Sequence, residues 1–194
     1  MNQKVLLLLV CFINIGTLTN AQNLAKSFAA NARNETPTAP VFSPNDELVA
    51  AGVFGAVRVW NFETGTFTDY KTNAKNETPE FVQFSPDGQY IAAGVFGGVR
   101  VWKLGTDQYT DYEGRAKNST PVSVTFSPDG QYIAAGVFGR VRLWNLASGR
   151  YQDFNAKVKN ETPQFVQFSS DGRFIMAGVF GEVRTWDISE KVFN

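Results

Sequence analysis

The chain has 194 residues, 18 basic and 18 acidic side chains, and no histidine. The missing histidine excludes Ser–His–Asp and Cys–His catalysis and histidine–zinc sites. The balanced charge argues against a surface for nucleic acid or for an anionic membrane.

The first 21 residues have the pattern of a secretory signal peptide. Lys4 precedes an apolar run from Val5 to Ile13, and small residues flank a cleavage point after Ala21. An uncleaved anchor or a buried strand is the alternative. Cleavage removes Lys4 and Cys11, which leaves a net charge of −1 and no thiol. We therefore expect a secreted, extracellular protein whose folded domain occupies residues 22–194 and has no membrane span.

A block of 42 residues is repeated four times after this segment. The copies are 34–75, 76–117, 118–159 and 160–194, and no insertion breaks their register. The same spacing marks the tryptophans Trp60, Trp102, Trp144 and Trp186. Such a period indicates a repeat architecture, in which each unit buries its apolar faces against its neighbours.

The second copy predicts four short antiparallel strands, at 81–84, 89–95, 99–102 and 109–112. A Ser-Pro-Asp-Gly sequence predicts a type I turn after the first strand, and a Phe-Gly pair predicts a tight turn after the second. Small residues at 92–94 would let a neighbouring sheet approach closely. No helical periodicity outlasts the turns.

The segment Val82–Trp102 resembles a WD40 repeat, and so do Val124–Trp144 and Val166–Trp186. The resemblance implies an all-β, four-bladed WD40-like β-propeller with about 42 residues per blade. It also implies a non-catalytic binding or signalling protein, and we expect no cofactor and no metal. The polar network of such blades is missing, because there is no histidine and alanine replaces the usual serine at Ala51, Ala93, Ala135 and Ala177.

The two ends of the domain predict how the ring closes. Residues 26–33 align with 68–75, and residues 191–194 align with 65–68. We therefore expect the ends to share one outer strand, so that residues 26–33 help to close the ring. The alternative is half of an eight-bladed ring, completed by homodimerisation. Pro40 replaces the valine of the other copies and removes a ladder donor, so we expect the first blade to be the loosest.

The loop that leads into each copy carries an Asn-x-Thr sequence, the acceptor for N-glycosylation. The alternative is that Asn and Thr only shape the turn. In a four-stranded meander these lead-in loops share one face with the Phe-Gly turns. The predicted glycosylation sites are Asn34, Asn76, Asn118 and Asn160.

The Phe-Gly turns contain Phe54, Phe96, Phe138 and Phe180. Buried, these side chains would fill the space between blades, and this is the interpretation we favour. Exposed, they would form a ring of partner contacts. The four tryptophans are expected to be structural core residues. The third-strand arginines Arg58, Arg100, Arg142 and Arg184 predict a solvated or interblade-paired row. Asp69, Asp111 and Asp153 also recur, which leaves paired-carboxylate catalysis formally open.

Two hypotheses for function follow. The first is a secreted, N-glycosylated binding or signalling protein that contacts an extracellular protein. The second is a lectin-like, multivalent carbohydrate binder with one site per blade. Neither involves nucleic acid.

Overall fold

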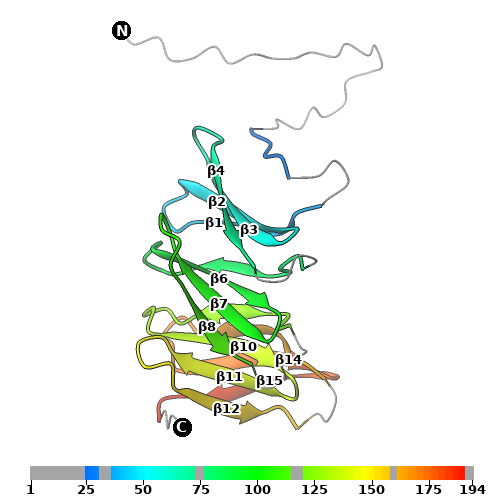
Figure 1. Ribbon diagram of the computed structural model, residues 1–194. Helices are drawn as coiled ribbons and strands as arrows, with labels where there is room; N and C mark the ends of the chain where they lie inside the picture. Colours follow the sequence, from blue (N-terminus) through cyan, green and yellow to red (C-terminus); the bar gives the residue numbers. More distant parts are fainter. Residues whose placement is uncertain (1–24, 31–35, 73–76, 115–119, 158–160, 191–194) are drawn as a thin grey trace, which may run out of the picture.

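The computed structural model describes residues 25–30, 36–72, 77–114, 120–157 and 161–190. Every regular element in these ranges is a β-strand (Figure 1). The predicted signal peptide at 1–21 lies outside the described residues. In the ranges given, no helix is long and apolar enough to span a membrane.

The strands form four antiparallel sheets, one for each copy of the repeat. The first sheet contains β1 (Thr38–Phe42), β2 (Leu48–Val53), β3 (Ala56–Asn61) and β4 (Phe67–Lys71). The second contains β5 (Val82–Phe84), β6 (Tyr90–Val95), β7 (Gly98–Lys103) and β8 (Tyr109–Glu113). The third contains β9 (Val124–Phe126), β10 (Tyr132–Val137), β11 (Arg140–Asn145) and β12 (Tyr151–Asn155). The fourth contains β13 (Gln164–Phe168), β14 (Phe174–Val179) and β15 (Glu182–Asp187).

Each sheet is a meander, in which strands adjacent in sequence are hydrogen-bonded neighbours. The strands predicted for the second copy are confirmed to within one residue at each end. Serine and aspartate stabilise the first turn of this copy, because the Ser85 hydroxyl bonds the Asp87 carboxylate and accepts from the Tyr90 amide. The predicted all-β architecture of four antiparallel sheets is confirmed, and it is consistent with a four-bladed WD40-like propeller.

Neighbouring sheets pack through one repeated apolar interface. Between the first and second sheets, Val57, Val59 and Tyr70 meet Ile91 and Trp102. Equivalent clusters fill the next two interfaces. An outer-strand ring meets a tryptophan of the following sheet in each case: Tyr70 with Trp102, Tyr112 with Trp144, and Phe154 with Trp186.

Glycines on the second strands make this close approach possible. A Cβ at Gly94 would lie 2.1 Å from the Pro121 carbonyl oxygen, and one at Gly136 would lie 1.8 Å from that of Pro163. Gly52 faces the Pro79 carbonyl in the same way. The predicted close approach of neighbouring sheets at these small residues is therefore confirmed.

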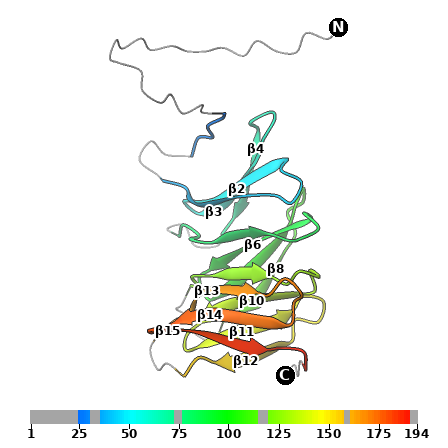
Figure 2. The same cartoon turned by 180° about the vertical axis from the view of Figure 1, so that it is seen from behind.

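The sheets follow one another from the first, at the upper end in Figures 1 and 2, towards the third and fourth at the lower end. The inner strands β1, β5, β9 and β13 contact one another in that order. Among the described strands, no packing of this extent joins β13–β15 back to β1–β4. Residues 26–30 lie against the first sheet, as the expected closure requires, but no described hydrogen bond joins them to β15. Residues 31–33 and 191–194 lie outside the described ranges.

The inner strands of the two terminal sheets are irregular. The register shifts within β1 between Thr38 and Val41, and within β13 between Gln164 and Gln167. Ala39 and Phe165, equivalent in the repeat, adopt positive φ angles of 39° and 53°. Because β13 has no proline, Pro40 alone does not explain the irregular first blade.

Candidate functional site

A two-residue Phe-Gly turn joins the second and third strands of each sheet. The glycines adopt φ angles between 74° and 90°, which Gly tolerates without steric cost. The phenylalanine therefore occupies the tip of the turn, beyond the last paired residues of both strands. These turns lie at one end of the sheets.

Lead-in loops lie beside these turns, as the meander topology predicts. The Gly55 amide donates to the Glu77 carbonyl at 2.7 Å, and the Gly139 amide donates to the Glu161 carbonyl at 2.8 Å. The Phe180 amide donates to the Glu161 carboxylate. We call the surface formed by the four Phe-Gly turns and the lead-in loops the Phe-Gly face.

The turn phenylalanines are exposed. Their accessible fractions are 54% for Phe54, 60% for Phe96, 40% for Phe138 and 83% for Phe180. The favoured interpretation, that these side chains fill the space between blades, is wrong. The tight turn carries the ring beyond the sheet, and valines, tyrosines and tryptophans already fill the interblade space.

Two recesses flank Phe96 on this face. One, of about 440 Å³, extends from Glu77 along Val95–Arg100 to residues 111–114. The other, of about 420 Å³, lies between Glu77 and Pro121. Glu77 borders both recesses, and its Oε1 accepts a hydrogen bond from the Thr120 hydroxyl. Its Oε2 is buried and has no hydrogen-bond partner among the described atoms. An exposed ring thus stands between two hollows that share a carboxylate.

The four predicted glycosylation asparagines, Asn34, Asn76, Asn118 and Asn160, lie outside the described residues. The threonines of their sequons are described. Thr36 is exposed, and Thr78, Thr120 and Thr162 are half-buried.

The sequence predicted that the third-strand arginines form either a solvated row or a row paired between blades. The structure shows the paired row. Arg142 is typical: its Nε and Nη2 donate to the two Asp153 carboxylate oxygens at 2.6 and 2.9 Å. Its Nη1 donates to the Glu113 carbonyl of the preceding sheet at 3.1 Å, and its guanidinium lies 3.8 Å from the Tyr151 ring. Arg58 with Asp69, and Arg100 with Asp111, repeat the bidentate pair.

These pairs assign a structural role to the recurrent aspartates. Arg58, Arg100 and Arg142 are buried, with side-chain exposures of 3%, 3% and 7%. The hydrogen bond from Arg58 holds the pKa of Asp69 below its ordinary value against the opposing effect of burial. The sequence signal for the pairs is the constant separation of 11 residues, which places Arg and Asp opposite each other on adjacent strands.

The repeat tryptophans are packed between the sheets. Trp60, Trp102 and Trp144 are between 1% and 3% exposed, whereas Trp186 in the fourth sheet is half-buried. They are structural residues with no access to a ligand in the first three sheets.

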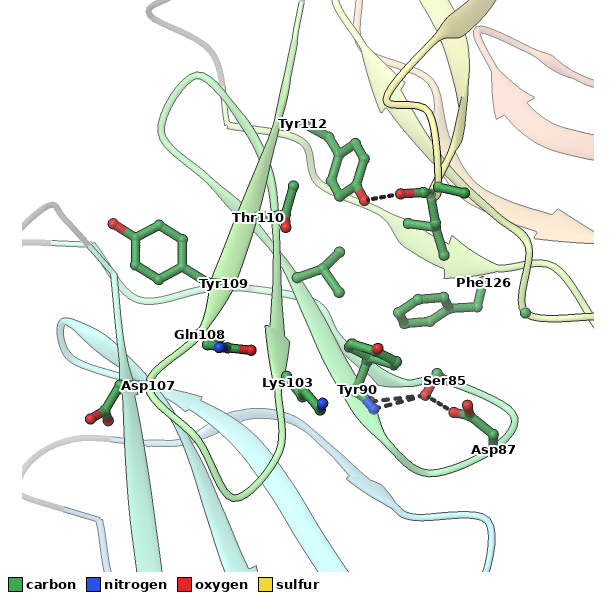
Figure 3. A pocket seen from close by; sticks show the side chains of 14 residues that line it. Ser85, Asp87, Tyr90, Lys103, Asp107, Gln108, Tyr109, Thr110, Tyr112 and Phe126 are labelled. Carbon is green, nitrogen blue, oxygen red and sulfur yellow. Dashed lines mark hydrogen bonds between the residues drawn. The ribbon is translucent and has the colours of Figure 1, made fainter.

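A separate groove of about 780 Å³ lies between the second and third sheets (Figure 3). Tyr112 and Phe126 border it, with the turn of Ser85 and Asp87 at its far end. The Tyr112 hydroxyl donates to the Leu146 carbonyl at 2.9 Å across the sheets. Burial raises the pKa of Tyr112.

Part of the polar lining of this groove is peculiar to the second sheet, although Tyr109 recurs as Tyr151 and the turn of Ser85 and Asp87 recurs in the third and fourth sheets. Its second-sheet residues Lys103, Asp107, Gln108 and Tyr109 correspond to Asn61, Gly65, Thr66 and Phe67 one repeat earlier. Among the described residues, no three His, Cys, Asp or Glu side chains are grouped so that they could hold a metal ion.

Comparison with protein families agrees with this geometry. The family model described as WD domain, G-beta repeat matches residues 108–145, which run from the end of the second sheet through most of the third. This match and the four antiparallel sheets are consistent with a WD40-like propeller. No curated protein matches the chain.

Proposed function

We propose that this chain is a secreted, N-glycosylated protein-interaction module that binds a partner protein through its Phe-Gly face. One observation carries the proposal: four large apolar side chains, between 40% and 83% exposed, occupy the same turn of four sheets. Grouped exposed apolar residues mark interaction sites on folded proteins. WD40 repeats are typical of protein-interaction scaffolds, which supports the same class by analogy of fold.

The shape of the Phe-Gly face suits a protein ligand. Exposed aromatic side chains beside recesses are typical of the anchors that dominate binding energy. At Phe96, a partner's apolar side chain would occupy either hollow. We therefore expect the partner to present apolar side chains to these hollows.

A binding role without catalysis is part of the proposal. The chain has no histidine, and the recurrent aspartates pair with buried arginines. Carboxylates held in such pairs are poorly placed to exchange protons with a substrate.

Secretion and glycosylation rest on the sequence of the leader and of the lead-in loops. The test is the mass of the protein secreted by eukaryotic cells, before and after enzymatic removal of N-linked glycans. We expect a loss of mass and an N-terminus at Gln22. An unchanged mass, or a retained leader, would count against this part of the proposal.

Carbohydrate binding is the second candidate, and the groove between the second and third sheets favours it. Tyr90 is partly exposed there, beside Asp87, Lys103 and Gln108. Sugars bind to such mixtures of aromatic and polar side chains. Because Lys103, Asp107 and Gln108 have no counterparts of the same type in the first and third sheets, the groove supports one sugar site rather than one per blade. Titration with a glycan array tests this, since binding to a defined sugar that is lost in Tyr90→Ala would favour the second candidate.

Photo-cross-linking tests the proposed protein-binding face. The photoreactive p-benzoylphenylalanine would replace Phe96 in one protein and Thr106 in a matched control. Thr106 lies in an exposed turn at the opposite end of the second sheet. Each protein would be irradiated with the secreted proteins of its source. We expect one defined adduct from position 96 and none from position 106. Equal labelling from both positions, or none from position 96, would contradict the proposal.

A further inference from the structure

Residues 25–30 occupy the place of an outer strand that belongs to no described sheet. The Phe28 ring lies 5.9 Å from Trp60, on the face of the first sheet that would meet a preceding one. The matching ring pairs of the following sheets are 6.5, 6.4 and 6.2 Å apart. Phe28 stands 42 residues before Tyr70, so the segment keeps the repeat register.

The backbone of this segment repeats the polar contact as well. Arg58 Nη1 donates to the Ala29 carbonyl at 3.3 Å, as Arg100 Nη1 donates to the Lys71 carbonyl at 3.3 Å. The segment therefore sits on the first sheet as β4 sits on the second sheet.

The fourth sheet shows the complementary gap. Among the described residues its order is β13-β14-β15, so β15 is an edge where the other sheets have an outer strand (Figure 2). Val183 on β15 is 69% exposed, whereas its equivalents Val57, Val99 and Val141 are fully buried. Met176 on β14 is 38% exposed, at a position where the other sheets bury an alanine completely.

The surroundings of Gly178 show the same uncovered face of the fourth sheet. The equivalents of Gly178 each lie against the proline carbonyl of a following sheet, at 1.8 to 2.1 Å from an added Cβ. At Gly178 the nearest atom is the carbonyl oxygen of Gln164, within its own sheet, at 3.4 Å. The fourth sheet thus has a face shaped for a following sheet, and no described residue covers it.

We propose that a second copy of this chain covers this face, with its residues 26–29 paired to β15 and its first sheet packed on the fourth. The repeat register of β3 and β4 places Phe28 of the second copy opposite Val183, and its Ala29 opposite Glu182. Pro37 of the second copy, equivalent to Pro79, would lie over Gly178.

The charges of β15 fit this occupant. The position of Asp69 in the repeat is occupied by Ser27 in the pairing segment, so the added strand brings no carboxylate to Arg184. Glu182 supplies one from β15 itself, through its ion pair with Arg184. In the other sheets the equivalent of Glu182 is Ala56, Gly98 or Arg140.

A contact between the fourth sheet of one copy and the first sheet of the next is head-to-tail. Two copies form a closed ring when the fourth sheet of the second copy makes the same contact with the first sheet of the first copy. Two variants test the contact without touching the interior of the chain. Val183→Lys charges the exposed patch, and Gly178→Ala adds a methyl group that has room in the single chain. Ala147→Lys, in an exposed turn of the third sheet, is the matched charge control.

Multi-angle light scattering would give the mass in solution across a dilution series. We expect two chains for the unmodified protein and for Ala147→Lys, and one chain for the two face variants, all with the same circular dichroism spectrum. A single-chain mass for the unmodified protein would overturn the proposal. So would a dimer that persists in both face variants.

Disulfide trapping separates a second copy from closure within one chain. In a Cys11→Ser background, Ala29→Cys and Glu182→Cys would be made in separate chains of different tag length. We expect a mixed disulfide of both chains when they are combined under oxidation, and no dimer from either alone. Absence of the mixed disulfide would overturn the proposal.

Discussion

Loss of one carboxylate from the arginine row should destabilise the fold far more than loss of a surface carboxylate. Asp153→Ala removes the acceptor of two bonds from Arg142, whose side chain is 7% exposed. Breaking one partner of a buried ion pair costs about 3–5 kcal/mol. Asp153 is itself 16% exposed, so we expect the low end of that range, about 3 kcal/mol. At about 2–4 °C per kcal/mol, the melting temperature should fall by roughly 6–12 °C.

Urea unfolding followed by circular dichroism measures this loss. The control is Asp187→Ala, which breaks an ion pair with Arg173 whose side chains are 57% and 40% exposed. The double variant Arg142→Met/Asp153→Ala removes both charges and should recover much of the stability. Equal losses in Asp153→Ala and Asp187→Ala would refute the reasoning, because they would show that burial of the arginine carries no cost.

Two further predictions concern contacts between sheets, and a third concerns an ion pair within the first sheet. Gly94→Ala should cost about 1–3 kcal/mol of unfolding free energy by overpacking against the Pro121 carbonyl, and a variant melting like the unmodified protein would contradict it. Tyr112→Phe should cost about 0.5–1.5 kcal/mol at neutral pH. Because burial raises the pKa of Tyr112, the neutral phenol stabilises the fold below its ordinary pKa of about 10, and this stabilisation is lost as the pH rises above that value. The free energy of unfolding of Tyr112→Phe should therefore fall less steeply above pH about 10 than that of the unmodified protein. An unchanged slope would argue against burial of the Tyr112 hydroxyl. Because the pKa of Asp69 is lowered, its ionised carboxylate stabilises the fold above pH about 3.8, and this stabilisation is lost as the pH falls below that value. Asp69→Asn should therefore make the free energy of unfolding depend less steeply on pH in the acid range. An unchanged slope would contradict the ion pair with Arg58.

The sequence predicted the architecture because the same local signals recur at every copy. Alternating strands, Ser-Pro-Asp-Gly turns and Phe-Gly turns depend on a few neighbouring residues, and four copies in register repeat the evidence. Glycine at position 94 also indicated a close approach between sheets, since only the absence of a Cβ allows the Pro121 carbonyl there.

The surroundings of the turn phenylalanines depend on distant residues and were predicted wrongly. An aromatic side chain in a repeat suggests a core position, and Trp102 follows that rule. Phe96 does not follow the rule, because the strand pairing ends at Val95 and the Phe96 side chain projects from the turn beyond the sheet. Val95, Val99 and Tyr112 already fill the space between the sheets, so no room remains there for the Phe96 ring. This packing becomes visible only in the structure.

The arginine row was predicted in part. Alternation on the third strand placed Arg100 on one face, but the same pattern fits a solvated row. The register with β8 decides between them, since it sets Asp111 directly opposite. The repeat alignment predicted that the outer strand beside β15 comes from the start of a chain, but it left open whether the same chain or a second copy provides that strand.

The central claim is that the phenylalanine tips serve binding and not folding. The most direct measurement is the free energy of unfolding of Phe96→Ser/Phe180→Ser, at the two most exposed tips, against the unmodified protein. We predict a change of at most about 0.5 kcal/mol per site, as for surface substitutions. A loss of about 3 kcal/mol or more per site, as for a phenylalanine removed from a core, would contradict the account.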